Sequence, residues 1–350
     1  MKYLILTLFS ITASAQNLVE FKFSKPHGVF EFFKATSNIV NSNKLLLKVY
    51  NDSKLKNKEN NKLIESNKEI LKYLPTNFSF KSNTKRRASG RSLLDQFTIQ
   101  SILSKDIEDF RSRTMGLVPV EIHKNFFERL SELEIIYEKL IWTENIAKMQ
   151  LYQRGIEQFA NKAKFDRLFK SSINFYKGNW PSNTPFIIGL HPIPISKGAT
   201  LAQSLGSVES VGVLINANDF ADRVGVIFHE ICHSIYASQS EEFKLYLEGL
   251  FSKNKSIYAP FAYQYFNEAM ATAIGNGLAY SQAAGNMDTG EWYENDYINK
   301  YSKALFEKVR IYFNSQRTID RYLVDHSIKQ FEKIFPKAHL DIENLLAEFT

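Results

Sequence analysis

The chain contains a single cysteine, lacks a long hydrophobic run and has no strong excess of charge of one sign. One cysteine in 350 residues excludes an internal disulfide and every zinc module built on several cysteines. The net charge of +7 is mild and scattered, so charge alone does not indicate a nucleic-acid-binding protein. A hydrophobic content of 44% with 14% aromatic residues excludes disorder over most of the chain.

The first fifteen residues have the pattern of a secretory signal. Lys2 precedes a short apolar run, and Ala13-Ser14-Ala15 supplies the small residues of a cleavage site. The run falls well short of the roughly 20 residues that a membrane-spanning helix needs, so we expect no transmembrane anchor. Cleavage near Ala15 would give a secreted or periplasmic protein. The alternative is a buried N-terminal strand.

Apolar periodicity predicts a mainly helical α+β protein with a small mixed or antiparallel sheet. After the signal at 1–15, we expect a region of strand and helices over 16–180 and a core with C-terminal helices over 181–350, unless 16–350 forms one compact unit. The expected strands are 19–23, 186–190 and 211–215, and the expected helices are 120–141, 219–236, 241–251, 260–277, 298–312 and 322–335. Residues 81–91 lack large apolar side chains and are expected to form an exposed loop.

The helix expected at 219–236 carries the pattern H-E-x-x-H, which suits a metal ion. At about 100° per residue, His229 and His233 lie about 40° apart on the helix, so both imidazoles can meet one ion. Glu230 points about 60° beyond His233, near enough to hold a water molecule without binding the metal. The rest of the helix surface is apolar, and a buried polar cluster needs a partner such as a metal ion. The alternative is a core helix whose histidines bond to backbone or carboxylate groups.

The third ligand divides the classes of zinc enzyme, because catalytic zinc usually takes three protein ligands and one water. The extended pattern H-E-x-x-H-x-x-G-x-x-H needs glycine at position 236 and histidine at position 239. The chain has Tyr236 and Gln239, so that class is excluded.

A glutamate on a second helix is a candidate for the third ligand. The helix expected at 260–277 contains Asn267 and Glu268 amid small residues that let helices pack closely. The helix expected at 241–251 and a return loop can bring Glu268 back to the two histidines. The rival third ligands are Glu241, Glu242 and Glu248.

The H-E-x-x-H pattern followed by Asn-Glu resembles the thermolysin-like zinc peptidases with a glutamate third ligand, the gluzincins. The resemblance covers residues 219–277. It implies a zincin-like catalytic core and one zinc ion held by His229, His233 and Glu268. It also implies that Glu230 is the general base in the hydrolysis of a peptide or protein substrate.

Two roles stay open within that resemblance. Many relatives have an aspartate one turn after the ligand glutamate, bonded to the first histidine, whereas this chain has Thr272 there. The donor that stabilises the oxyanion is usually a tyrosine, histidine or arginine. Tyr258 is the leading candidate, because it precedes Glu268 in the loop entering that helix. The other candidates are Tyr263, Tyr280, Tyr322 and His326.

Three further features have less specific interpretations. The strand expected at 211–215 either pairs with an extended peptide substrate or is an ordinary buried strand. His191, which follows the strand expected at 186–190, is expected to be a loop histidine without a function. Cys232 lies between Glu230 and His233, and we expect it to be a small buried packing residue.

The sequence therefore predicts an exported zinc metallopeptidase, with three alternatives. A metal-binding protein without hydrolytic activity would have no use for Glu230. A zinc hydrolase of a non-peptide substrate would use the same residues. Nucleic-acid binding through the cations Lys85, Arg86, Arg87 and Arg91 is not expected, because no aromatic residues are interleaved there to stack on bases.

Overall fold

The structure, a computed structural model, describes residues 18–39, 42–74 and 92–340. The expected signal segment at 1–15 and the expected loop at 81–91 lie outside these residues. None of the described helices is both long enough and apolar enough to cross a membrane.

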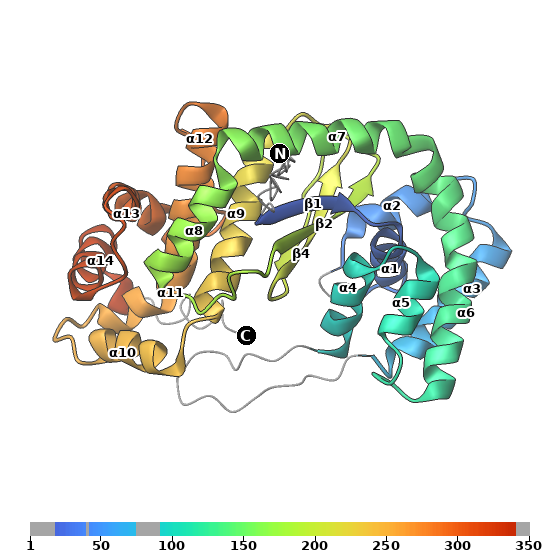
Figure 1. Cartoon of the computed structure of the whole chain (residues 1–350), viewed down its shortest axis with the longest axis horizontal. Helices are drawn as coiled ribbons and strands as arrows, with labels where there is room; N and C mark the ends of the chain where they lie inside the picture. The colour runs from blue at the N-terminus through green and yellow to red at the C-terminus, as the bar shows by residue number, and fades with distance from the viewer. Residues whose placement is uncertain (1–17, 40–41, 75–91, 341–350) are drawn as a thin grey trace, which may run out of the picture.

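A mixed sheet of four strands lies between two groups of helices (Figure 1). Its order is β1 (Val19–Phe23), β2 (Phe186–Ile193), β4 (Val208–Leu214) and β3 (Ala202–Ser204). The first three strands are parallel, with Phe23 opposite Leu190 and Leu190 opposite Val211, and β3 is antiparallel to β4. The three strands expected from the sequence are present, and β2 runs three residues beyond its apolar segment.

The structure favours one of the two interpretations of the segment expected at 211–215. Strand β4 lies between β2 and β3 and is buried at every residue, as expected of an ordinary buried strand. Alternating apolar residues predict a strand, but the order of strands depends on contacts between distant segments. The short strand β3 was not predicted, because its three residues are too few to show an alternation of apolar and polar side chains.

Helices make up most of the fold, which confirms a mainly helical α+β protein. The helices are α1 (Lys25–Thr36), α2 (Lys44–Asn51), α3 (Lys58–Leu71), α4 (Leu93–Leu103), α5 (Ile107–Arg113), α6 (Val120–Tyr137), α7 (Thr143–Lys162), α8 (Phe165–Tyr176), α9 (Phe220–Ala237), α10 (Glu241–Ser252), α11 (Ala259–Thr272), α12 (Tyr280–Ala284), α13 (Asp296–Asn314) and α14 (Arg321–Ile334). Two π-helical segments, η1 (Glu138–Trp142) and η2 (Ala273–Ala279), continue α6 and α11, and a short 3-10 turn, η3 (Ala338–Leu340), follows α14.

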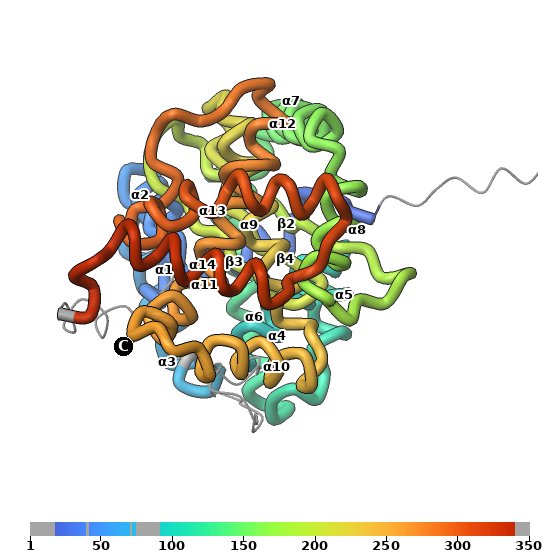
Figure 2. The backbone as a smooth tube through the Cα atoms, turned by 90° about the vertical axis from the view of Figure 1, so that its left-hand side faces the viewer, coloured from blue at the N-terminus to red at the C-terminus, as the bar shows by residue number. Residues whose placement is uncertain are grey.

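The two faces of the sheet belong to different hydrophobic clusters. Side chains alternate along a strand, so Leu190 and Val211 pack on one face with α7 to α14, whereas Ile193 and Leu214 pack on the other with α1 to α6. Helices α7 and α8, which the sequence places in the 16–180 region, thus pack with the C-terminal elements. Figure 2 shows α10, α11, α13 and α14 on the near side, in front of α9 and the sheet.

Candidate metal centre

Helix α9 is buried through most of its length and carries the H-E-x-x-H pattern. Its apolar residues Val224, Ile227, Phe228, Ile231 and Ile235 are fully buried. Cys232 is buried and forms no disulfide, as expected for a packing residue. A helix held on several sides fixes the orientation of its polar side chains, which a metal site requires.

Two histidines of α9 and one glutamate of α11 converge on one point. His229 Nε2 lies 2.9 Å from His233 Nε2, and the carboxylate oxygens of Glu268 lie 3.5 Å and 3.3 Å from these two atoms. In a tetrahedral zinc site with bonds of about 2.0–2.1 Å, the ligand atoms lie about 3.3–3.4 Å apart. The three side chains therefore have the spacing of a zinc ligand set.

The cluster is embedded at one end and open at the other. The side chain of His229 is 8% exposed, that of His233 is 18% exposed and that of Glu268 is 35% exposed. A closed structural zinc site has four protein ligands, whereas this site offers three and remains accessible. Solvent therefore reaches the carboxylate of Glu268.

The second ring nitrogen of each histidine faces a polar side chain of α11. Thr272 Oγ1 lies 3.3 Å from His229 Nδ1, and the Asn267 amide lies 3.0 Å from His233 Nδ1. The Oδ1 atom of Asn267 is buried and has no hydrogen-bond partner within the described part of the chain. A half-turn of that amide lets Oδ1 accept from Nδ1–H of His233, which leaves Nε2 with the lone pair that a metal needs. The residues present thus fit a zinc ion.

The cluster favours positive charge between its side chains. Burial by itself would lower the pKa of His233, but the carboxylate of Glu268 outweighs burial and raises this pKa to about 9. Burial would raise the pKa of Glu268, whereas the two imidazoles hold it far below its usual range. Glu268 is therefore ionised, and a bound cation supplies the positive charge that this carboxylate favours.

Glu230 lies beside the ligands but is held by the sheet. Its Oε2 accepts a hydrogen bond of 3.1 Å from the backbone N–H of Ser204, the last residue of β3. Glu230 does not belong to the group of ligand atoms formed by His229, His233 and Glu268. Its carboxylate is thus fixed between the candidate metal centre and the edge strand.

A second carboxyl group, that of Glu209, lies near Glu230. Glu209 of β4 is fully buried, pairs in register with Ser204, and neither of its carboxyl oxygens has a hydrogen-bond partner in the described segments. Burial raises the pKa of Glu209 well above its usual range, and the charge of Glu230 raises it further. This environment therefore favours the protonated form of Glu209. A single glutamate in an apolar strand gives no sequence signal of this environment.

Close packing between α9 and η2 brings the two ligand-bearing segments together. A Cβ atom at Gly275 would lie 2.5 Å from the carbonyl oxygen of Gly225 and 2.5 Å from the backbone nitrogen of His229. Both neighbouring atoms belong to backbone, so they cannot turn away as a flexible side chain can. The absence of a side chain at Gly275 is therefore a condition for the observed distance between α9 and η2, which continues α11.

The leading candidate for oxyanion donor from the sequence is not at the metal centre. Tyr258 precedes the first residue of α11, so ten residues of helix, about 15 Å, separate it from Glu268. Its hydroxyl donates a hydrogen bond of 2.7 Å to the carbonyl oxygen of Pro336. This position gives no support to Tyr258 as the oxyanion donor. The two residues are only ten positions apart in the sequence, but the helix between them holds them far apart in space.

Another tyrosine, which the sequence analysis missed, lies beside the ligands. The ring centroid of Tyr293 is 6.0 Å from that of His229. Tyr293 lies between α12 and α13 and belongs to no motif, so only the folded chain brings it to the site. Among the other candidates, Tyr322 is 74% exposed on α14.

The rival third ligands from the sequence lie on α10. Glu241 pairs with Lys244 at 2.8 Å. Among the described residues, Glu268 supplies the one carboxylate of the cluster around His229.

His191, expected in a loop, lies inside β2 and is buried, so its expected position is wrong. The strand continues through Pro192 and Ile193, which the apolar pattern did not reveal. Burial lowers the pKa of His191 to about 4.

Comparison with known proteins gives no family for the chain. No protein-family model, curated protein or solved structure matches it. Its activity is therefore inferred from its own residues and their geometry.

Proposed function

We propose that the chain is a zinc-dependent metallopeptidase with a zincin-like catalytic core. The observation that carries the proposal is the convergence of His229, His233 and Glu268 at 2.9–3.5 Å, with Glu230 beside them and outside the ligand set. The position of helix α9 next to an edge strand of a mixed sheet supports it. A purely structural metal site would not need the fourth polar residue.

In this proposal each residue of the centre has one task. His229, His233 and Glu268 hold one zinc ion, which supplies a Lewis acid and makes a bound water more acidic. Glu230 accepts a proton from the attacking water and returns it to the leaving amine. The hydrogen bond from Ser204 N–H keeps the carboxylate of Glu230 in position for both transfers.

The edge strand β3 favours a peptide as substrate. The N–H of Leu205 donates to the carbonyl oxygen of Val208, so it points toward β4. Backbone N–H groups of successive residues point to opposite sides of a strand, so the N–H of the preceding residue, Ser204, points to the outer edge. That N–H meets Glu230, so the outer edge of β3 lies beside the general base. An extended peptide that adds to this edge would present its backbone carbonyl groups to the centre.

Tyr293 is the better-placed candidate for the oxyanion donor, since its ring lies against that of His229. The signal-like segment at 1–15 adds export to the proposal, as a secreted or periplasmic enzyme.

Digestion of a broad peptide library tests the function. We expect cleavage by the zinc-loaded protein, loss of cleavage with a chelator, and recovery when zinc is returned. The variant His229→Ala should bind no zinc at this centre and cleave nothing, whereas Glu242→Ala on α10 should behave as the wild type. Zinc bound through His229 without any cleavage would instead support a non-hydrolytic metal-binding protein. Cleavage of esters or amides but not peptides would support a non-peptide hydrolase.

A further inference from the structure

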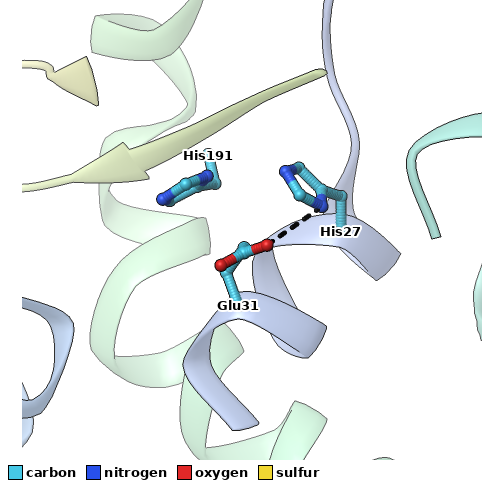
Figure 3. Close-up of side chains that lie close together, drawn as sticks. All are labelled: His27, Glu31 and His191. Carbon is cyan, nitrogen blue, oxygen red and sulfur yellow. Dashed lines mark ion pairs between the residues drawn. The ribbon is translucent and has the colours of Figure 1, made fainter. Parts of the chain in front are cut away.

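A second cluster of metal-binding side chains lies on the opposite face of the sheet from α9. His27 and Glu31 lie one turn apart on α1, and His191 lies on β2. Figure 3 shows that these three side chains point toward one another. His191 pairs in register with Gly212, which lies two residues before Leu214 and so on the same face of the sheet. Leu214 packs with α1 to α6. The group is therefore separated from the candidate zinc centre by the sheet.

We propose that His27, Glu31 and His191 form a second metal site, for a divalent transition-metal ion such as zinc. One ligand atom from each of the three lies within 4.8 Å of the others. Two imidazoles and one carboxylate are the donor set that zinc accepts. This proposal rests on residues outside the α9 centre and does not depend on the proposed peptidase activity.

The strongest support is an unpartnered histidine deep in the protein. His191 is 2% exposed, and neither of its ring nitrogens has a hydrogen-bond partner among the described residues. Buried polar atoms without partners are costly, and buried imidazole nitrogens are usually bonded or bound to a metal. A metal ion satisfies the nitrogen of His191 that carries the lone pair.

A cavity beside the cluster provides space for an ion and its water. Its volume is about 220 Å³, and Glu31, His191 and Ser210 are among the residues that line it. Asn43 also lines it, and the buried Nδ2 of Asn43 likewise has no partner in the part of the chain that is described. A Cβ at Gly212 would lie 2.6 Å from this Nδ2 and 2.9 Å from His191 Nε2, so the glycine keeps this space open.

The surroundings of His27 leave one of its nitrogens available. The hydroxyl of Ser101 donates to the carbonyl of Thr98 at 2.7 Å, so it accepts from His27 Nδ1, 3.2 Å away. Nε2 of His27 then carries the lone pair. The hydroxyl of Ser210 lies 3.1 Å from this Nε2 and 3.3 Å from Glu31 Oε1, and its single proton can go to only one of them. When Ser210 donates to Glu31, the lone pair of His27 Nε2 is left for a metal. This arrangement resembles that of His229 and Thr272, where a hydroxyl fixes the ring and leaves Nε2 for a metal.

Lys34 is the competitor of a metal ion at this site. Its ammonium lies 2.6 Å from Glu31 Oε1 and 3.4 Å from the hydroxyl of Thr98. A carboxylate has lone pairs for more than one partner, so Glu31 can bind an ion while Lys34 remains nearby. Repulsion between the ammonium and the ion nevertheless weakens binding. Replacing Lys34 by methionine should therefore tighten it.

Zinc counting by elemental analysis tests the second site. After loading with zinc and removal of excess, we expect two equivalents in the wild-type protein and one in His191→Ala. The control His123→Ala removes a buried histidine of α6 that bonds to Thr114, far along the chain from both centres, and should retain two equivalents. A zinc content that does not fall by one equivalent from the wild type to a folded His191→Ala variant would overturn the proposal.

Two other variants keep the test independent of the folding of His191→Ala. The double variant His229→Ala/His233→Ala leaves the second cluster unchanged and should bind one equivalent, and binding of none would contradict the proposal. Competition with a chelator should show at least about tenfold tighter binding at the second site in Lys34→Met. Weaker or unchanged binding in that variant would also contradict it. Loss of the α9 centre alone would count against the peptidase and not against this site.

Discussion

Replacing Gly275 by alanine should disturb the candidate metal centre on α9, although Gly275 is not one of the proposed ligands. The added Cβ would lie 2.5 Å from the backbone nitrogen of His229 and from the carbonyl oxygen of Gly225. Ordinary contacts of this kind start near 3.4 Å. Helix α9 and η2 must therefore separate by roughly 1 Å, because neither backbone atom can rotate away.

The expected size of the effect follows from two opposing terms. Forcing an extra carbon into this contact costs about 3 kcal/mol, the upper end of the usual overpacking range. Alanine gains about 1 kcal/mol over glycine in a helix, so the free energy of unfolding should fall by about 2 kcal/mol. A shift of roughly 1 Å between His229 and Glu268 also exceeds the tolerance of about 0.2 Å in metal–ligand distances. Zinc affinity should fall at least about tenfold.

Urea unfolding of the metal-free protein and competition with a chelator measure these two effects. The matched control is Gly249→Ala on α10, where a Cβ would have no neighbour within 4 Å. That control should be as stable as the wild type or about 0.5–1 kcal/mol more stable, with unchanged zinc affinity. The reasoning is refuted if Gly275→Ala matches Gly249→Ala in both measurements.

Three further predictions concern single residues around the centre. Glu268→Ala should lose zinc at the α9 centre, whereas Glu242→Ala should keep it, as measured by zinc content; loss in both variants would contradict the choice of third ligand. Thr272→Val removes the hydroxyl next to His229 and should weaken zinc binding about 10–100-fold in a chelator competition. An unchanged zinc affinity would show that this contact does not orient the ring of His229. Tyr258→Phe should lower the free energy of unfolding by about 0.5–1.5 kcal/mol with kcat unchanged, and a large loss of kcat would return Tyr258 to the reaction.

Helix α9 and the convergence of its two histidines could be predicted from the sequence, because the relevant spacing lies within one element. His229 and His233 are one turn apart, and helical geometry alone brings their imidazoles together. The buried residues around them are consecutive in the same pattern, so the helix over 219–236 was predicted within one residue of α9 at its C-terminal end. Glu268 required a second element, and there the resemblance to gluzincins supplied what spacing did not.

The remaining features depend on how distant segments pack. His27 and His191 meet only because β2 lies against α1, and no local pattern reports that contact. The order of strands placed β4 inside the sheet and gave the outer edge to β3, whose three residues show no period. Tyr293, whose ring lies beside that of His229, belongs to the segment between α12 and α13, which has no regular structure around it. Each of these positions is set by tertiary contacts and not by the residue's neighbours in the sequence.

The central claim is that Glu230 acts as the base for zinc-dependent peptide hydrolysis. The most direct measurement compares the rate of peptide cleavage by the wild-type protein with that of Glu230→Gln, both folded and carrying the same amount of zinc. The substitution keeps the size of the side chain and a hydrogen-bonding oxygen but removes the proton acceptor, so we expect cleavage to fall by about 10²–10⁴-fold while zinc content stays unchanged. A zinc-loaded Glu230→Gln variant that cleaves peptides at the wild-type rate would contradict the account.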